Sequence, residues 1–328
     1  MNVVAALKLN MTNVDDPRAG NHERYRAALE MAEYAERVGF AVVNVEEHHG
    51  SGTGWLPAPL LMAAAVAART ERIRISIGAL IVPLYDPVRL AEDLAVLDNL
   101  AGGRLTVLAA IGYRPSEYAA LGRDFTRRGT LMDEALEIML AAWRDEPVRR
   151  GGQSFEVTPK PFSKPHPQLL VAGMSPATAR RAARFGLGLA LPLPAPEVEE
   201  LYERELIRCG TSGYIHKPEP DSRHTLLHED PDRAWHDFAP HILTEIREYA
   251  SWGREGIHRP HDAVPDSVES LRAHGYLEIL TPAQLRDQIA AGRTEILMNP
   301  LIGGLPIEAG WDSLRLLGED VLSLTTVR

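Results

Sequence analysis

Short apolar runs alternate with amphipathic helical segments along most of this chain, and this alternation limits its fold more than any other feature. The alternation predicts helices over residues 22–38, 57–69, 86–100, 129–144 and 196–208, and one further helix that begins at Ser175. Strands are predicted between them, over residues 2–9, 40–46, 73–82, 104–111, 168–172 and 186–190. Strands that alternate with helices pair in parallel, so the pattern predicts an α/β domain.

The C-terminal third completes this pattern with a weaker strand over 224–228, a strand over 294–298 and a final helix over 308–322. About eight strands in 328 residues favour one closed (β/α)8 TIM barrel covering 1–328. Residues 231–293 are too long for one crossover and are expected to form a helical insertion before the last strand. An open doubly wound sheet is the rival fold, although no Gly-x-Gly-x-x-Gly turn follows an early strand.

The composition excludes several classes of protein. A net charge of −10 argues against a nucleic-acid binder, and the single cysteine, Cys209, excludes an internal disulfide. There is no signal peptide pattern and no apolar run near the ~20 residues that span a bilayer, so a soluble, cytoplasmic protein is expected. No metal site is expected, and five histidines are expected to be solvated: His216, His224, His228, His236 and His241.

The residues Glu46-Glu47-His48-His49 follow the second predicted strand. Two carboxylates and two imidazoles are costly to bury without partners, and catalytic groups gather at this end of barrel strands. Glu46 and His49 can alternate outward and pair with a neighbouring helix. A strand's period of two then leaves Glu47 or His48 facing a site.

Three further segments of the chain can contact a ligand. Gly173-Met174-Ser175 ends a strand, and Ser175 with Thr178 can either cap the next helix or bind a phosphate at its N-terminus. At the end of the fourth strand, Gly112 permits close backbone approach. The adjoining Tyr113 and Arg114 can contact a ring or an anion, or form an ordinary loop. Gly78-Ala79 lies inside the third strand, where glycine marks a bulge or a ligand contact.

Taken in order, these motifs resemble those of the bacterial-luciferase-like flavin-dependent monooxygenases. Glu47-His48-His49 matches the family's Glu-His-His, and the run from Arg72 to Leu121 matches in order and spacing. Phe162 to Gly186 matches the next strand and helix, and Gly303-Gly-Leu-Pro306 matches the C-terminal part. The resemblance covers nearly the whole chain and is poorest over 210–275.

The resemblance implies an oxidoreductase that takes reduced FMN (FMNH2) from a separate flavin reductase. In such monooxygenases FMNH2 reacts with O2 to give a flavin C4a-peroxide, which oxidises a small organic substrate. His48 matches the catalytic acid–base residue, with Glu47 and His49 beside it. The residues that would contact the flavin are Gly78, Ala79, Ile111, Gly112, Tyr113, Arg114, Gly173, Met174, Ser175 and Thr178.

One departure from the family keeps other functions open. Luciferases carry an arginine where this chain has Ile111, and that arginine helps to hold the flavin phosphate. Arg114 or Arg180 can replace it, or the protein can be an oxidoreductase that uses the deazaflavin F420, or a non-catalytic flavin-binding relative. The substrate is not readable, because the loops that would select it lie in 50–57, 145–167 and 250–280.

The composition of the second and third predicted helices, over 57–69 and 86–100, indicates a homodimer, and the resemblance implies one too. They are rich in alanine and leucine and offer an apolar face made of Leu60, Ala64, Ala68, Leu90, Leu94 and Leu97. Such a face is an aggregation hazard when it is exposed.

Overall fold

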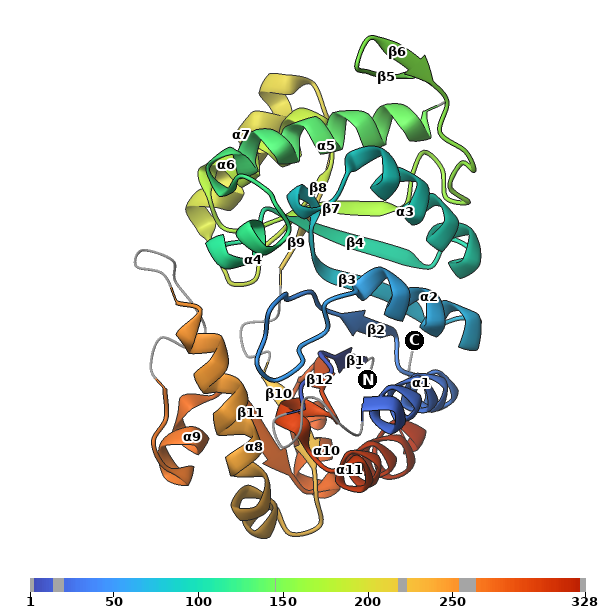
Figure 1. Cartoon of the computed structure of the whole chain (residues 1–328). Helices are drawn as coiled ribbons and strands as arrows, with labels where there is room; N and C mark the ends of the chain where they lie inside the picture. Colours follow the sequence, from blue (N-terminus) through green and yellow to red (C-terminus); the bar gives the residue numbers. More distant parts are fainter. Residues whose placement is uncertain (1–2, 14–20, 145, 218–222, 254–263, 325–328) are drawn as a thin grey trace. The chain divides into compact units, whose positions relative to one another are not determined.

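The computed structural model describes residues 3–13, 21–144, 146–217, 223–253 and 264–324. The chain divides into two compact units (Figure 1). The first contains the described residues up to 57, residues 69–73 and those from 223 onward, and the second contains residues 58–68 and 74–217. Both alternate parallel strands with helices, which confirms the α/β prediction.

The first unit has five parallel strands in the order β11-β10-β12-β1-β2. Its elements are β1 (Val4–Leu9), α1 (Asn21–Val38), β2 (Val42–Val45), β10 (His224–Leu227), α8 (Pro231–Ser251), α9 (Val268–His274), β11 (Leu277–Leu280), α10 (Pro282–Ala290), β12 (Glu295–Met298), η3 (Ile302–Gly304), α11 (Ile307–Asp320) and η4 (Leu322–Leu324).

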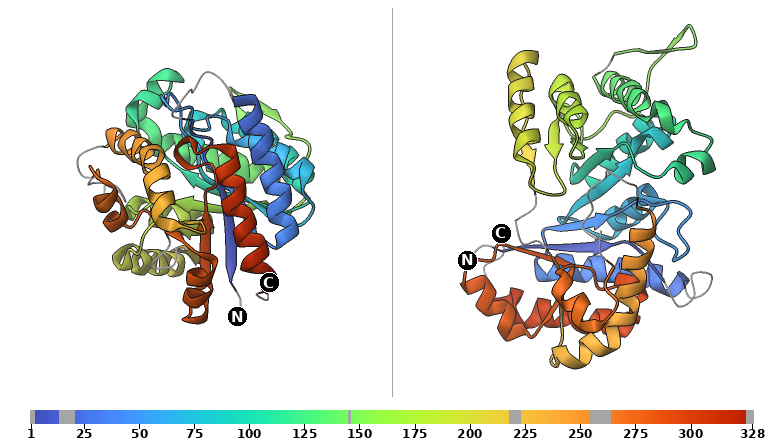
Figure 2. Two further views of the ribbon diagram at one scale, coloured as in Figure 1. Left: turned by 90° about the horizontal axis from the view of Figure 1, so that it is seen from below. Right: turned by 90° about the vertical axis from the view of Figure 1, so that its left-hand side faces the viewer.

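One face of the central strands of this unit is entirely apolar. Its fully buried side chains include Leu7, Leu9, Val43, Val45 and Met298. Helices α1 and α11 pack side by side in the same unit (Figure 2). A Cβ at Gly318 on α11 would lie 2.8 Å from the Tyr34 hydroxyl of α1, so glycine permits this close approach.

The second unit has five parallel strands in the order β3-β4-β7-β8-β9. Its elements are α2 (Pro59–Arg69, whose last residue is grouped with the first unit), β3 (Arg74–Ile81), η1 (Val82–Leu84), α3 (Pro87–Ala101), β4 (Leu105–Ala110), α4 (Pro115–Ala120), η2 (Phe125–Arg127), α5 (Arg128–Trp143), β5 (Val148–Arg150), β6 (Gln153–Phe155), β7 (Gln168–Ala172), α6 (Pro176–Phe185), β8 (Gly188–Ala190), α7 (Pro196–Cys209) and β9 (Ile215–His216).

The predicted strands and helices agree with the structure within two residues at each end, and Asn2 of the first strand lies outside the described residues. Asp86 is the N-cap of α3, since its carboxylate accepts from the backbone N–H groups of Val88 and Arg89. Four short strands, β5, β6, β9 and β11, are not among the strands predicted above, because two to four residues carry too little alternation.

The segment 231–293 is mostly helical, as predicted, but it is not purely an insertion outside the sheet. Strand β11 lies within it and pairs in parallel with β10 over four residues. Its Leu277 and Ile279 are buried beside Phe238 and Ile242 of α8, so the segment contributes to the core of the first unit. Residues 254–263 of this segment lie outside the described residues.

The prediction that six side chains of α2 and α3 form an exposed apolar face is wrong for three of them. Leu90, Leu94 and Leu97 recur at i, i+4 and i+7 on α3, and they are buried within the second unit. The large apolar side chains that α2 and α3 expose are Leu61, Val96 and Leu100, at 75%, 44% and 54% exposure. No helix among the described residues has the length and apolar character to cross a membrane.

Candidate functional site

The four residues after β2 each have a separate role. Glu46 pairs with Lys8 on the neighbouring strand β1, at 2.9 Å, rather than with a helix as one alternative held. Glu47 is buried, and its carboxylate lies 3.0 Å from Nε2 of His49, which donates to it in the Nε2–H tautomer. The carboxylate therefore orients the His49 ring, and His48 is left to a different environment.

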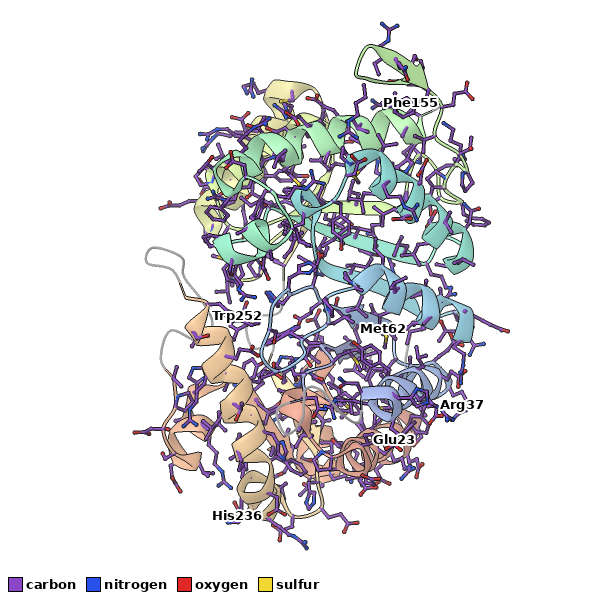
Figure 3. All side chains as sticks on the ribbon, in the orientation of Figure 1. Glu23, Arg37, Met62, Phe155, His236 and Trp252 are labelled. Atoms are coloured by element: carbon purple, nitrogen blue, oxygen red, sulfur yellow. The ribbon has the colours of Figure 1, made fainter. Side chains whose placement is uncertain are left out.

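His48 lies among three aromatic rings and is only 9% exposed. Its ring centroid is 5.1 Å from that of Trp55, 6.0 Å from that of Tyr249 and 4.6 Å from that of Trp252. Trp252 directly follows α8, at the end of the helix opposite His236 (Figure 3). An imidazole enclosed in this way can exchange a proton with a ligand while the rings keep water away.

Helix α8 also fixes the loop that carries Trp55. The Glu248 carboxylate accepts from Ser51 Oγ at 2.8 Å, from the Gly52 N–H at 2.7 Å and from the Thr53 hydroxyl. This face of α8 was not predicted from the sequence. Its signal was present, because Glu245, Glu248, Tyr249 and Trp252 recur at i, i+3, i+4 and i+7, the spacing of one helical face.

In the second unit, the Gly78–Ala79 peptide is cis. The pairing of β3 with β4 shifts register between Gly78 and Leu80, which confirms the predicted bulge. After β4, Gly112 has φ +66°, and a Cβ there would lie 2.7 Å from Ile81 Cγ2. Only glycine fits this turn without strain.

Arg114 does not supply a free positive charge beside Ile111. Its Nη1 donates to the Glu117 carboxylate at 3.1 Å, and both side chains are buried. Ile111 is itself half-buried, and its carbonyl accepts from the Tyr118 hydroxyl. Tyr113 is also half-buried. Arg114 therefore adds no net charge to this end of β4.

The turn after β7 is a helix N-cap, as predicted. Ser175 Oγ accepts from the Thr178 N–H at 3.2 Å and lies 2.9 Å from the Thr178 hydroxyl. Gly173 has φ +138°, and a Cβ there would lie 3.0 Å from Thr178 Oγ1. Met174, between them, is half-buried. The corner offers two hydroxyls and the positive end of α6, both suited to an anion.

The arginines of α6 have acidic partners. Arg181 and Arg184 lie 2.6 and 3.0 Å from the Asp133 carboxylate, and Arg180 lies 4.0 Å from Glu205. Positive charge at the start of α6 therefore comes from the helix dipole rather than from an unpaired guanidinium group.

The expectation that five histidines are solvated is wrong for His224. It is 4% exposed, its Nε2 lies 3.4 Å from Lys8 Nζ, and its ring packs edge-on against Tyr276. It lies on β10, where all four residues are buried. No three His, Cys, Asp or Glu side chains of the described ranges are grouped as a metal site requires.

Replacing Glu248 with glutamine is expected to loosen the loop over 51–56. The substitution removes a carboxylate that accepts three hydrogen bonds, each worth about 1.5–3 kcal/mol when one partner is charged. Hydrogen exchange of the 51–56 amides should be at least about tenfold faster, since 1.4 kcal/mol corresponds to a factor of ten. The matched control is Asp237→Asn, an exposed carboxylate on the same helix. Equal exchange in both variants would contradict the role of Glu248.

Comparison with known proteins identifies the family. Residues 7–299 match the luciferase-like monooxygenases. The chain is 25% identical over 309 residues to the oxygenase component of the flavin-dependent trigonelline monooxygenase of Acinetobacter baylyi, covering 90% of this chain and 84% of that protein. It is 31% identical over 194 residues to protein y4wF of Sinorhizobium fredii, covering 58% of this chain and 57% of y4wF. The chain thus spans less than two thirds of the length of that relative.

The fold is also that of a solved monooxygenase. The crystal structure of RslO1 from Streptomyces bottropensis is 28% identical, covers 98% of this chain and 99% of its own, and superposes with a TM-score of 0.76. This likeness, together with the family match, confirms the predicted luciferase-type TIM-barrel fold class. The chain belongs to the luciferase-like monooxygenase family.

Proposed function

We propose that this protein is the oxygenase component of a two-component monooxygenase that uses reduced FMN and O2 to oxidise a small organic substrate. The observation that carries the proposal is His48, an imidazole enclosed by Trp55, Tyr249 and Trp252 at the end of β2. The name of the trigonelline relative, an oxygenase component, supports a separate reductase as the source of reduced flavin.

The residues of the second unit fit the phosphate of FMN. Ser175 and Thr178 provide two adjacent hydroxyls at the start of α6, and Gly173 leaves room where a Cβ would crowd the Thr178 hydroxyl. A single terminal phosphate suits a helix N-terminus with hydroxyl donors. The acidic glutamyl tail of F420 would need unpaired cations, whereas Arg114 and Arg181 here have carboxylate partners.

Each part of the chain has a role in this proposal. Bound reduced FMN supplies the electrons that activate O2. Gly78, Ala79, Ile111, Gly112, Tyr113 and Met174 would contact the flavin, as the family resemblance implies. His48 would hold and move the proton of the reaction, and Glu47 would keep His49 oriented beside it. The rings of Trp55, Tyr249 and Trp252 would exclude water around His48.

We also propose a homodimer that forms through α2 and α3. The side chains that would form the contact are Leu61, Val96 and Leu100, which are exposed, rather than the buried Leu90, Leu94 and Leu97. Exposed leucines of this size are characteristic of interaction surfaces when they group together.

Replacing His48 with alanine is expected to lower the turnover number about 10²- to 10⁴-fold, the usual contribution of a general acid–base group. The assay couples the protein to a flavin reductase and follows oxygen incorporation into a panel of small organic compounds by mass spectrometry. Flavin affinity and the melting temperature should change little. His236→Ala, on an exposed histidine of α8, is the control. Full activity in His48→Ala would make the Glu-Glu-His-His run structural.

Anaerobic titration is expected to give tighter binding of reduced FMN than of oxidised FMN, and weak or no binding of F420. Thr178→Val should weaken binding of FMN about tenfold but leave that of riboflavin unchanged, because only FMN has a phosphate for the hydroxyl to contact and a hydrogen bond to a charged group is worth about 1.5–3 kcal/mol. Micromolar binding of F420 without binding of reduced FMN would overturn the monooxygenase proposal.

Replacing Leu61 with aspartate is expected to convert a dimer into a monomer. Light scattering at micromolar concentration should give twice the 36.1 kDa chain mass for the wild type and the single chain mass for the variant. Ile207→Asp, which changes an equally exposed side chain on α7, should remain dimeric. A monomeric wild type would refute the dimer.

A further inference from the structure

The face of β1 and β2 opposite their apolar side is polar near the C-terminal ends of the strands. Along it lie Lys8 of β1 and Asn44 of β2, followed by Asn10 just after β1 and Glu46 just after β2. Lys8 is level with Asn44, and Leu7 is level with Met298 of β12. The next residue, Asn299, is therefore level with Lys8. By this register, Lys8 and Asn44 lie beside each other on their strands, and Asn299 lies beside Lys8 directly after the end of β12.

Part of this polar face is fully satisfied by the protein. Asn10 donates to the Glu245 carboxylate of α8 at 3.0 Å. The same carboxylate accepts from the Thr12 hydroxyl at 2.9 Å, from the Tyr276 hydroxyl at 2.8 Å and from the Gly303 N–H at 2.7 Å. All of these are contacts inside the first unit.

Other polar atoms of this face have no hydrogen-bond partner among the described residues. Asn299 is fully buried, and neither its amide oxygen nor its amide nitrogen has a hydrogen-bond partner among the described residues. The same holds for the Asn44 amide oxygen and for Glu46 Oε2, both of which are buried atoms. Buried polar groups in native proteins are nearly always hydrogen-bonded, so four such atoms together point to something that binds them.

The charges of Lys8 and Glu46 compensate each other. Lys8 Nζ lies 2.9 Å from Glu46 Oε1 and 3.4 Å from His224 Nε2. Burial lowers the pKa of Lys8, but Glu46, Glu245 and Tyr249 together raise it more, so the pKa of Lys8 lies above its ordinary value. An anionic ligand would find no uncompensated cation among these residues, whereas a neutral group that both donates and accepts matches the open atoms.

We propose that Asn44, Glu46 and Asn299 form a subsite that binds a neutral hydroxyl or amide group of the organic substrate. The open acceptors Asn44 Oδ1 and Glu46 Oε2 would receive its protons, and the Asn299 amide would both donate and accept. This inference rests on the proposed monooxygenase function and names the kind of substrate that the function acts on.

The first test compares benzamide with benzoate, a neutral and a charged probe of nearly the same shape, by saturation-transfer NMR titration. Wild type should bind benzamide at least tenfold more tightly than benzoate. Asn299→Leu, which keeps the size of the side chain, should weaken benzamide binding at least tenfold. Absence of saturable benzamide binding to the wild type, or equal binding to wild type and variant, would overturn the proposal.

A second variant tests the effect of the Lys8–Glu46 ion pair. Glu46→Gln leaves Lys8 without its carboxylate, so the preference for benzamide over benzoate should fall at least tenfold. An unchanged preference would contradict the subsite.

Thermal unfolding without any ligand separates a substrate subsite from a buried water site. Asn299→Leu should keep or raise the melting temperature, because it removes an amide that has no partner in the protein. The matched control Asn10→Leu should lower it, because Glu245 loses a donor. A similar loss in both variants would mean that Asn299 is bonded to structural water and would overturn the proposal. Asn44→Leu, at a half-buried position, repeats the test if Asn299→Leu does not fold.

Titration with FMN distinguishes this inference from the proposed function. FMN affinity should be unchanged in Asn299→Leu. A loss equal to that for benzamide would assign the subsite to the amide edge of the flavin ring and overturn its assignment to the substrate. If FMN fails to bind wild type while the benzamide results hold, the subsite stands and the monooxygenase proposal fails.

Discussion

One buried carboxylate holds together the strand ends of the first unit. Glu245 of α8 is 1% exposed and accepts hydrogen bonds from Asn10, Thr12, Tyr276 and Gly303. A carboxylate taken out of water must have such donors, because its desolvation is otherwise prohibitive. The bonds fix α8 against the end of β1. The next turns of the same helix then bring Glu248, Tyr249 and Trp252 to the loop and the imidazole that follow β2.

Pairing of charges is the rule at both sets of candidate residues. Arg114 is matched by Glu117, Arg181 by Asp133 and Lys8 by Glu46. In the proposed sites, ligand recognition therefore falls to helix dipoles, hydroxyls and amides rather than to unpaired cations. This pairing of charges underlies both the proposed phosphate site and the proposed substrate subsite. A terminal phosphate would be held by Ser175 and Thr178, and a neutral substrate group by amides beside a closed ion pair.

The alternation of strands and helices was predictable because hydrophobic periodicity is a local property of the sequence. Gln168–Ala172 agrees with the structure for that reason, and the cap at Ser175 agrees because a cap also depends on residues close together in the sequence. Short strands such as β9 and β11 were missed, since two to four residues carry too little periodicity. Leu90, Leu94 and Leu97 were assigned to a surface because the sequence cannot tell which neighbour an apolar stripe packs against.

The sequence by itself determined the family, the order of the elements and the residue types at the ends of the strands, including Glu47, His48 and His49. These follow from local pattern and from motifs that remain in order along the chain. Only the tertiary structure decided the partners. It joined Lys8 to Glu46, buried His224, and set Trp55, Tyr249 and Trp252 around His48. The physical reason is that a hydrogen bond or a ring contact depends on distance in space, and residues about 200 positions apart meet only once the chain is folded.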